Sequence, residues 1–141
     1  MGLLSHRTLD LASAQRIAAA CQAAAGALEV AVCIAVSNRN GELLAFSRMD
    51  GAPMLSAQLA QDKAWSVASF NGMPTDDWWP ILEKEPSLLH GIVKTDRLTV
   101  FGGGRPVLVD GELVGAVGVS GGTAEQDTEI AAAGAADSLP S

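Results

Sequence analysis

Three polar residues stand in contexts where they could carry out chemistry: Lys63, Asp50 and Arg105. Lys63 lies in a stretch rich in Ala, Leu and Trp, where partial burial would lower its pKa and let the amine act as a base or nucleophile. Arg105 follows three glycines, so it could grip a carboxylate bidentately while the ligand approaches the backbone closely. This set would suit a cofactor-free lyase, hydratase or isomerase acting on a small carboxylated intermediate, with Lys63 or Asp50 moving the proton.

Each of these residues also has a purely structural explanation. Lys63 could extend its amine to solvent from the edge of a helix. Asp50 precedes a glycine after a strand, which is typical of an Asx turn. Arg105 could be an ordinary arginine on an edge strand. The sequence leaves both interpretations open.

Two histidines and a tryptophan pair indicate a different chemistry, the binding of a flat cofactor. His6 and His90 are the only imidazoles, so a haem iron held by histidine must use one of them. His90 has apolar neighbours, which suits an axial ligand and equally a packed loop histidine. Trp78 and the adjacent Trp79 cannot easily both point inward, so an exposed member of the pair would mark an interface or the lid of a pocket.

The elements that must position these residues follow from hydrophobic periodicity and turn signals. The segment 75–98, with two tryptophans and two prolines, is the hardest to interpret and predicts a short helix plus loops. The remaining expected elements are a helix from Thr8 to about Ala25, strands over 30–37 and 42–49, a helix over 54–70, a strand over 99–101, a hairpin and a final helix from Thr123.

The last third of the chain carries the sharpest local signals. Asp110-Gly111 between two apolar runs predicts a type I′ hairpin turn. Thr123 and Gln126 have the spacing of a capping box at the start of a helix. The glycine-rich elbow before Thr123 resembles an anion nest, but Glu125 and Asp127 would repel a phosphate there. We therefore interpret the elbow as a tight turn rather than a nucleotide site.

The order of elements, with hairpin-linked strands and intervening helices, predicts an α+β fold: a mainly antiparallel five-stranded sheet with flanking helices. Both faces of the strand over 30–37 are apolar, which indicates that helices cover both sides of the sheet. A length of 141 residues fits one domain spanning 1–141.

Composition narrows the function classes. Hydrophobic residues make up 48% of the chain and charged residues 18%, which favours a folded domain over disorder. A net charge of −7 argues against nucleic acid and against anionic membranes as partners. Neither a secretory signal nor a membrane-spanning run is visible, so we expect a cytoplasmic protein in which Cys21 and Cys33 are buried free thiols. The many small apolar residues suggest that a second subunit covers part of the surface.

Three segments together resemble the GlcG/HbpS-like family of haem-degrading or haem-binding domains, which is related to the C-terminal domain of PduO-type proteins. They are Leu43–Ala52 with its Arg-Met-Asp-Gly-Ala sequence, the Gln61–Ala64 helix segment, and Gly115–Asp127. The resemblance implies a profilin-like domain that forms homo-oligomers, often dimers that build octamers. It also implies a link to haem or corrinoid handling, or an accessory role in a catabolic operon.

Two segments depart from that family. Members usually carry a Pro-Gly-Gly-x-Pro stretch before the last hairpin, where this chain has Gly102–Pro106, and the tryptophan-containing segment 76–86 replaces a loop of small residues. This loop could shape a pocket for a different ligand.

The leading hypothesis is therefore an oligomeric small-ligand-binding protein that holds haem or a related flat cofactor. His90 or His6 would supply the axial ligand, with Arg105 and Trp78 beside the cofactor. The few cations available for haem propionates are Arg48, Lys63, Arg97 and Arg105. The alternatives are the cofactor-free enzyme described above and a structural partner of a larger enzyme.

Overall fold

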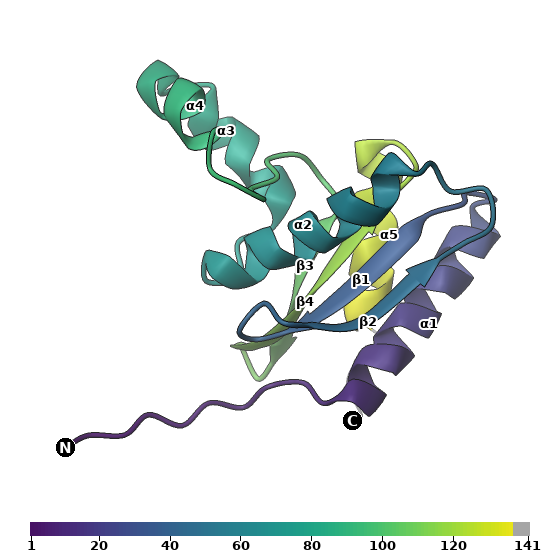
Figure 1. Ribbon diagram of the computed structural model, residues 1–141, viewed down its shortest axis with the longest axis horizontal. Coiled ribbons are helices and arrows are strands. Elements are labelled where there is room, and N and C mark those ends of the chain that lie inside the picture. Colours follow the sequence, from purple (N-terminus) through teal and green to yellow (C-terminus); the bar gives the residue numbers. More distant parts are fainter. Residues whose placement is uncertain (137–141) are drawn as a thin grey trace.

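A four-stranded antiparallel sheet forms the centre of the protein in a computed structural model that describes residues 1–136 (Figure 1). The strands lie in the order β2-β1-β4-β3. Helix α2 covers one face of the sheet, and α1 and α5 pack side by side on the other. The elements are α1 (Leu11–Ala27), β1 (Cys33–Asn38), β2 (Leu43–Arg48), α2 (Leu55–Ser69), the 3₁₀ helix η1 (Thr75–Asp77), α3 (Trp78–Leu82), α4 (Pro86–Ile92), β3 (Gly104–Val109), β4 (Glu112–Ser120) and α5 (Ala124–Ala136).

This architecture confirms the predicted α+β fold with flanking helices, but the expected fifth strand is wrong. The segment 99–101 does not join the sheet, because its backbone is held by a side chain instead of a neighbouring strand. The amide of Thr99 donates to the hydroxyl of Ser66 on α2 at 2.9 Å. The strand β4 continues its bonding one residue before β3, where the Val119 amide donates to the Gly103 carbonyl at 2.9 Å. The profilin-like resemblance stays a prediction.

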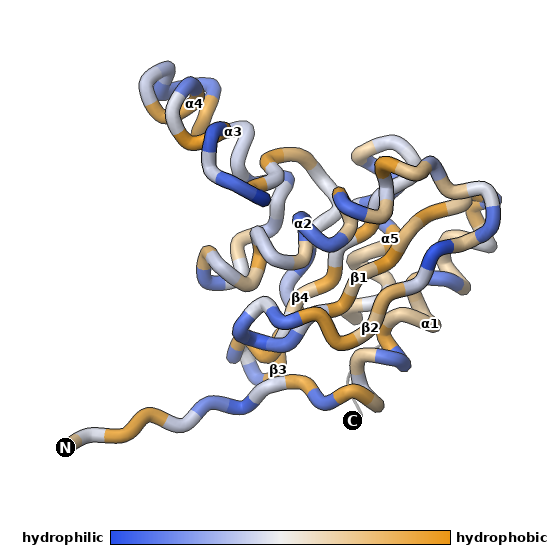
Figure 2. Tube along the Cα trace, viewed as in Figure 1, coloured by the Kyte–Doolittle hydropathy of each residue, from blue (hydrophilic) through white to orange (hydrophobic). Residues whose placement is uncertain are grey.

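The two faces of the sheet differ in the size of their side chains. Toward α1 and α5, the core is built from larger aliphatic residues such as Ile17, Ile34 and Ile130. Toward α2, it consists mainly of small residues, and α2 approaches the backbone of β4 directly. A Cβ atom on Gly118 would lie 1.9 Å from the Ala60 carbonyl oxygen. Hydrophobic residues accordingly concentrate along the central strands (Figure 2).

Most of the turns and helix ends that local sequence patterns predict are present in the structure. Asp110 and Gly111 have φ angles of 53° and 78°, the positive values that a type I′ turn requires. The capping box is present, since Thr123 Oγ1 accepts from the Gln126 amide at 3.1 Å and Gln126 Oε1 accepts from the Thr123 amide at 3.0 Å. The first helix differs: Asp10, not Thr8, is its cap.

The cap of α1 shifts because Thr8 is used elsewhere. Its hydroxyl oxygen accepts from the Arg39 amide at 3.0 Å, which ties the N-terminal segment to the turn between β1 and β2. Asp10 is then free to accept from the Ser13 amide at 2.8 Å.

The segment 75–98 forms η1, α3 and α4, more helix than the sequence predicted, and α3 and α4 project away from the sheet (Figure 1). Trp78 and Leu82 are the buried residues of α3, whereas α4 buries none of its residues. This projection therefore presents apolar side chains to its surroundings, among them Trp79, Ile81 and Val93.

Candidate functional site

Lys63 is a buried lysine at the end of the sheet where β4 stops. Its side chain extends from α2 and is only 1% exposed. The Nζ atom donates to the Val119 carbonyl at 2.8 Å and lies 3.3 Å from Oδ2 of Asp127, whose side chain is 4% exposed. The ion pair thus joins α2, on one face of the sheet, to α5 on the other.

The glycine-rich segments on both sides of this pair make room for it. Gly103 has a φ of +127°, and a Cβ atom there would lie 2.6 Å from Lys63 Nζ. The other oxygen of Asp127, Oδ1, accepts from the Gly122 amide at 2.9 Å. The carboxylate of Asp127 therefore occupies the position at the elbow that an external anion would need, which agrees with our interpretation of the elbow as a turn.

Lys63 is a buried cation whose charge is partly compensated by Asp127. Burial lowers the pKa of the Lys63 amine, because the ammonium loses its hydration, while the charge and hydrogen bond of Asp127 oppose that shift. The ring of Phe101 lies 5.0 Å from Nζ. In this arrangement the amine is withdrawn from solvent and held by groups of the protein. The catalytic assignment of Lys63 stays a prediction.

Arg105 forms a second polar cluster, on the edge strand β3. Its Nη2 atom lies 3.3 Å from Oδ2 of Asp76 in η1, and both side chains are about one-third exposed, at 32% and 37%. Trp78 follows η1 directly, is 3% exposed, and packs its ring 5.1 Å from the ring of Phe70. The Gly104 amide donates to the buried Thr75 hydroxyl at 2.8 Å, which fixes η1 against β3.

Three side-chain atoms of η1, α3 and β3 are buried without a described hydrogen-bond partner: Oδ1 of Asp76, Nε1 of Trp78 and Nε of Arg105. Buried polar atoms are normally paired, so each such atom calls for an explanation. Of the residues that the sequence suggested as ligand-binding, Arg105 pairs with Asp76, whereas Trp78 packs against Phe70. Trp79 is 54% exposed, which confirms that the two tryptophans do not both point inward.

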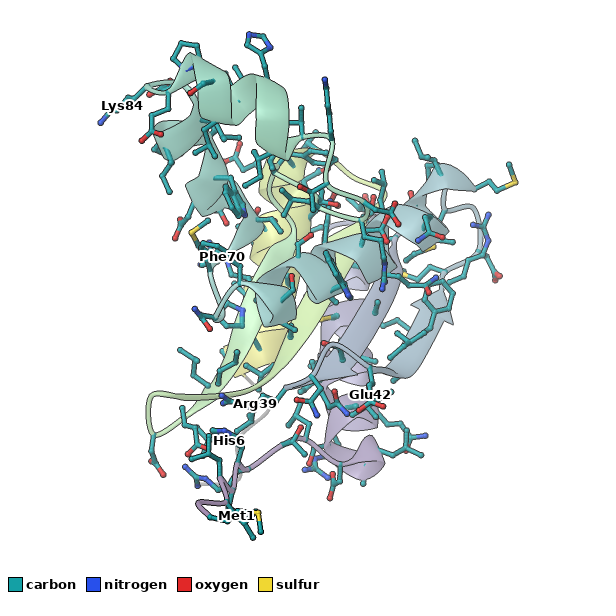
Figure 3. The ribbon with its side chains drawn as sticks, turned by 60° about the vertical axis from the view of Figure 1, so that its left-hand side comes forward. Met1, His6, Arg39, Glu42, Phe70 and Lys84 are labelled. Carbon is teal, nitrogen blue, oxygen red and sulfur yellow. The ribbon has the colours of Figure 1, made fainter. Side chains whose placement is uncertain are left out.

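The remaining predicted residues lie apart from both clusters. Asp50 is exposed in the turn after β2, beside Gly51 with its φ of +87°, and the described contacts do not join it to Lys63 or Arg105. His6 is exposed on the extended N-terminal segment, and His90 is exposed in the last turn of α4. The N-terminal segment and the α3–α4 projection lie at opposite ends of the molecule (Figures 1 and 3). One chain therefore cannot place both imidazoles on one iron.

Asp76, the ion-pair partner of Arg105, is a residue that the sequence did not indicate. It precedes the tryptophan pair in a segment without clear periodicity, and its partner Arg105 is 29 residues away. The sequence indicates Asp127 as a polar residue of interest in the first turn of the last helix, but no local signal predicts its pairing with Lys63 across 64 residues.

The structure also shows where the two cysteines and two of the remaining predicted cations lie. Cys21 and Cys33 are buried free cysteines, as predicted. Arg48 and Arg97, suggested as cations for a ligand, bond within the chain: Arg48 to the carbonyls of Ala52 and Pro53, and Arg97 to Asp62. Among residues 1–136, none of the helices is both long and apolar enough to cross a membrane.

A family model described as "Haem degrading protein HbpS-like" matches residues 9–136. A 15.0 kDa protein of Citrobacter freundii, from the region between dhaT and dhaS, is 36% identical over 126 residues, which cover 88% of this chain and 87% of that protein. Protein GlcG of Escherichia coli K12 is 39% identical over 89 residues, or 63% of each chain.

Three solved structures have similar folds over nearly the whole chain. Protein ORFY of Klebsiella pneumoniae is 37% identical with a TM-score of 0.90, covering 96% of this chain and 94% of that one. A double mutant of Streptomyces reticuli HbpS is 33% identical with a TM-score of 0.83, covering 95% and 89%. A PduOC–haem complex is 28% identical with a TM-score of 0.83, covering 92% and 94%.

Proposed function

Since the chain belongs to the HbpS-like family, we propose that it is a small-ligand-binding protein that binds haem or a related flat cofactor. The observation that carries this proposal is the similarity, over 92% of the chain, to a protein that was crystallised with haem. It is supported by an exposed imidazole, a side chain that can ligate a haem iron, on a helix that leaves apolar residues partly exposed.

His90 is the preferred axial ligand on geometric grounds. It lies in the last turn of α4, a helix that buries none of its residues although it contains Leu88, Leu89 and Ile92. None of the described hydrogen bonds or ion pairs uses the His90 ring, so its nitrogen is available to a metal. His6 is also exposed, but it lies on an extended N-terminal segment that belongs to no helix or strand, although Leu3 and Leu4 are exposed on it.

A haem on His90 would need a second wall, because α4 offers only one apolar side. We propose that a second copy of the chain supplies it, in a homo-oligomer such as a dimer or octamer. The apolar residues left uncovered on the projection support this, among them Trp79, Ile81 and Val93. Bound haem would supply the redox-active iron; the protein would orient the ring, exclude water and ligate the metal. Lys94, an exposed residue just after α4 and four positions from His90, would be a cation for a propionate.

An absorbance titration of the apo-protein with hemin tests the proposal. We expect a saturable, shifted Soret band that disappears in His90→Ala and persists in His6→Ala. The double variant is the matched control, because the chain has only two histidines. A spectrum of the native protein equal to that of the double variant would overturn histidine ligation. Light scattering during size-exclusion chromatography would test the oligomer, and a monomer at all concentrations would contradict it.

A further inference from the structure

The two edges of the sheet differ in whether a further strand could pair with them. An edge strand presents a row of unpaired N–H and C=O groups, which proteins usually block with Pro, Lys or a covering element. The edge strand β3 is blocked, because Pro106 has no N–H and the Gly104 amide donates to the Thr75 hydroxyl of η1 at 2.8 Å. The opposite edge strand, β2, contains neither Pro nor Lys, and among the described strands it pairs only with β1.

The outer side of β2 carries backbone groups that point away from the sheet. The Met49 amide donates to the Val32 carbonyl, just before β1, at 3.0 Å. Because successive residues of an antiparallel strand face opposite sides, the backbone groups of Phe46 and Arg48 face outward. The register shift between β1 and β2 falls at Leu44, so the strand is regular from there to Arg48.

The side chains along this edge are accessible and largely apolar. Leu43 and Phe46 are 49% and 38% exposed. Helix α1 runs alongside β2 (Figure 1). A cavity of about 380 Å³ separates the helix from the strand, so α1 leaves this edge uncovered; on the helix side it is lined by Gln15, Ala18, Ala19 and Gln22. A strand that approaches β2 would therefore meet both free backbone groups and apolar side chains.

The charges at the two ends of β2 indicate which strand would fit. Glu42 precedes the strand and Arg48 ends it; both are exposed. Among the ion pairs of residues 1–136, none uses either residue. An antiparallel copy of the same strand would bring the Arg48 end of each copy to the Glu42 end of the other. Opposite charges across neighbouring strands are stabilising, so β2 is complementary to itself.

We propose that β2 pairs in antiparallel orientation with β2 of a second copy, which joins the two sheets into one continuous sheet about a twofold axis. Leu44 of each copy exchanges backbone hydrogen bonds with Phe46 of the other, and Ala45 lies at the axis. This interface is distinct from the α3–α4 projection, and it does not depend on the binding of haem.

The end charges also select this register over its neighbour. Pairing Leu44 with Phe46 places Glu42 toward Arg48 of the other copy. The alternative, in which Phe46 pairs with itself, would place Glu42 toward Asp50, and like charges on opposite strands are destabilising.

Oxidative cross-linking of single-cysteine variants tests the register. Opposite residues that do not exchange hydrogen bonds lie about 4.5 Å apart between Cα atoms, within the range of about 4.4–6.8 Å that a disulfide spans. Ala45→Cys should therefore form a disulfide-linked dimer. Ser47→Cys is the matched control, because its two copies would be four residues, or about 13 Å, apart along the strands. The native thiols of Cys21 and Cys33 are fully buried and should not react. Equal cross-linking of the two variants, or none in either, would overturn the pairing.

Sedimentation of Phe46→Lys over a range of concentrations tests the interface without a cross-link. We expect the dissociation constant of the dimer to rise by about tenfold or more, because a lysine on an edge strand opposes pairing. Leu108→Lys on β3 is the matched control: Leu108 is 44% exposed on the blocked edge, so its association should equal that of the native protein. Circular dichroism checks the fold of both variants, and Ala45→Cys carries the test if Phe46→Lys does not fold. Unchanged association of folded Phe46→Lys would overturn this interface, whereas the haem proposal is decided separately by the Soret band.

Discussion

Removing either member of the buried Lys63–Asp127 pair should destabilise the protein severely, although neither residue lies in the hydrophobic core. Lys63→Met keeps the length of the side chain but leaves the Asp127 carboxylate buried with the Gly122 amide as its remaining described donor. It also leaves the Val119 carbonyl without the Nζ donor. Asp127→Asn keeps an acceptor for Gly122 but leaves a buried ammonium without its counter-charge.

The burial of both side chains determines how large the loss in free energy of unfolding should be. At 1% and 4% exposure, water cannot replace the lost partner. Breaking a buried pair from one side typically costs about 3–5 kcal/mol. The double variant should lose less than the sum of the single losses by about 1–3 kcal/mol, because neither charge is then left alone.

Urea unfolding followed by circular dichroism measures these differences. A loss of about 4 kcal/mol moves the midpoint by roughly 2 M for a domain of this size, which is easily resolved. Arg7→Met is the matched control: it removes a cation from an ion pair with Glu112 whose side chains are 57% and 35% exposed, so its effect should be far smaller. Single losses no larger than in the control, or losses that simply add in the double variant, would refute the reasoning.

The pH dependence provides an independent check on Lys63. Burial lowers the pKa of the amine in the folded protein below its ordinary value of 10.5. Between these two pKa values the unfolded chain binds more protons than the folded chain, so the free energy of unfolding rises with pH. Native protein should therefore gain stability relative to Lys63→Met as the pH rises toward 10.5. A difference that stays constant would show that the pKa is not lowered.

Three further outcomes follow from the packing. Gly118→Ala should lower the free energy of unfolding by several kcal/mol or prevent folding, because its Cβ would meet the Ala60 carbonyl at 1.9 Å. By contrast, Gly26→Ala in α1, with open space around it, should raise the free energy of unfolding measured in urea by about 0.5 kcal/mol. Burial raises the pKa of the Cys21 thiol to about 12, so iodoacetamide at pH 8 should leave Cys21 unmodified in the folded protein, and rapid alkylation detected by mass spectrometry would contradict that burial. Thr123→Ala should lose about 1 kcal/mol in thermal or urea unfolding through the capping box, while an unchanged midpoint would show that the cap contributes nothing.

Local chemistry explains why much of the fold could be predicted from the sequence. The Asp110-Gly111 turn and the Thr123–Gln126 capping box depend on residues at most three positions apart, and the structure contains both. The apolar faces of β1 likewise required helices on both sides of the sheet. Where several local solutions compete, the prediction was less accurate: Thr8 and Asp10 could each cap α1, and a bond to Arg39 decided between them.

The sequence by itself determined the α+β class, the order of most elements and the set of polar residues able to bind a ligand, because these depend on near neighbours and on residue type. Only the tertiary structure decided which of these polar residues lie together and which lie apart. It buried Lys63 in a pair with Asp127, paired Arg105 with Asp76, and left His90 exposed on a projecting helix. The segment 99–101 is not a strand, because the Thr99 amide donates to the Ser66 hydroxyl on α2 instead of to a neighbouring strand. Such pairings form between residues 29 to 64 positions apart, and only the packing of α2, η1 and α5 against the sheet brings those residues together.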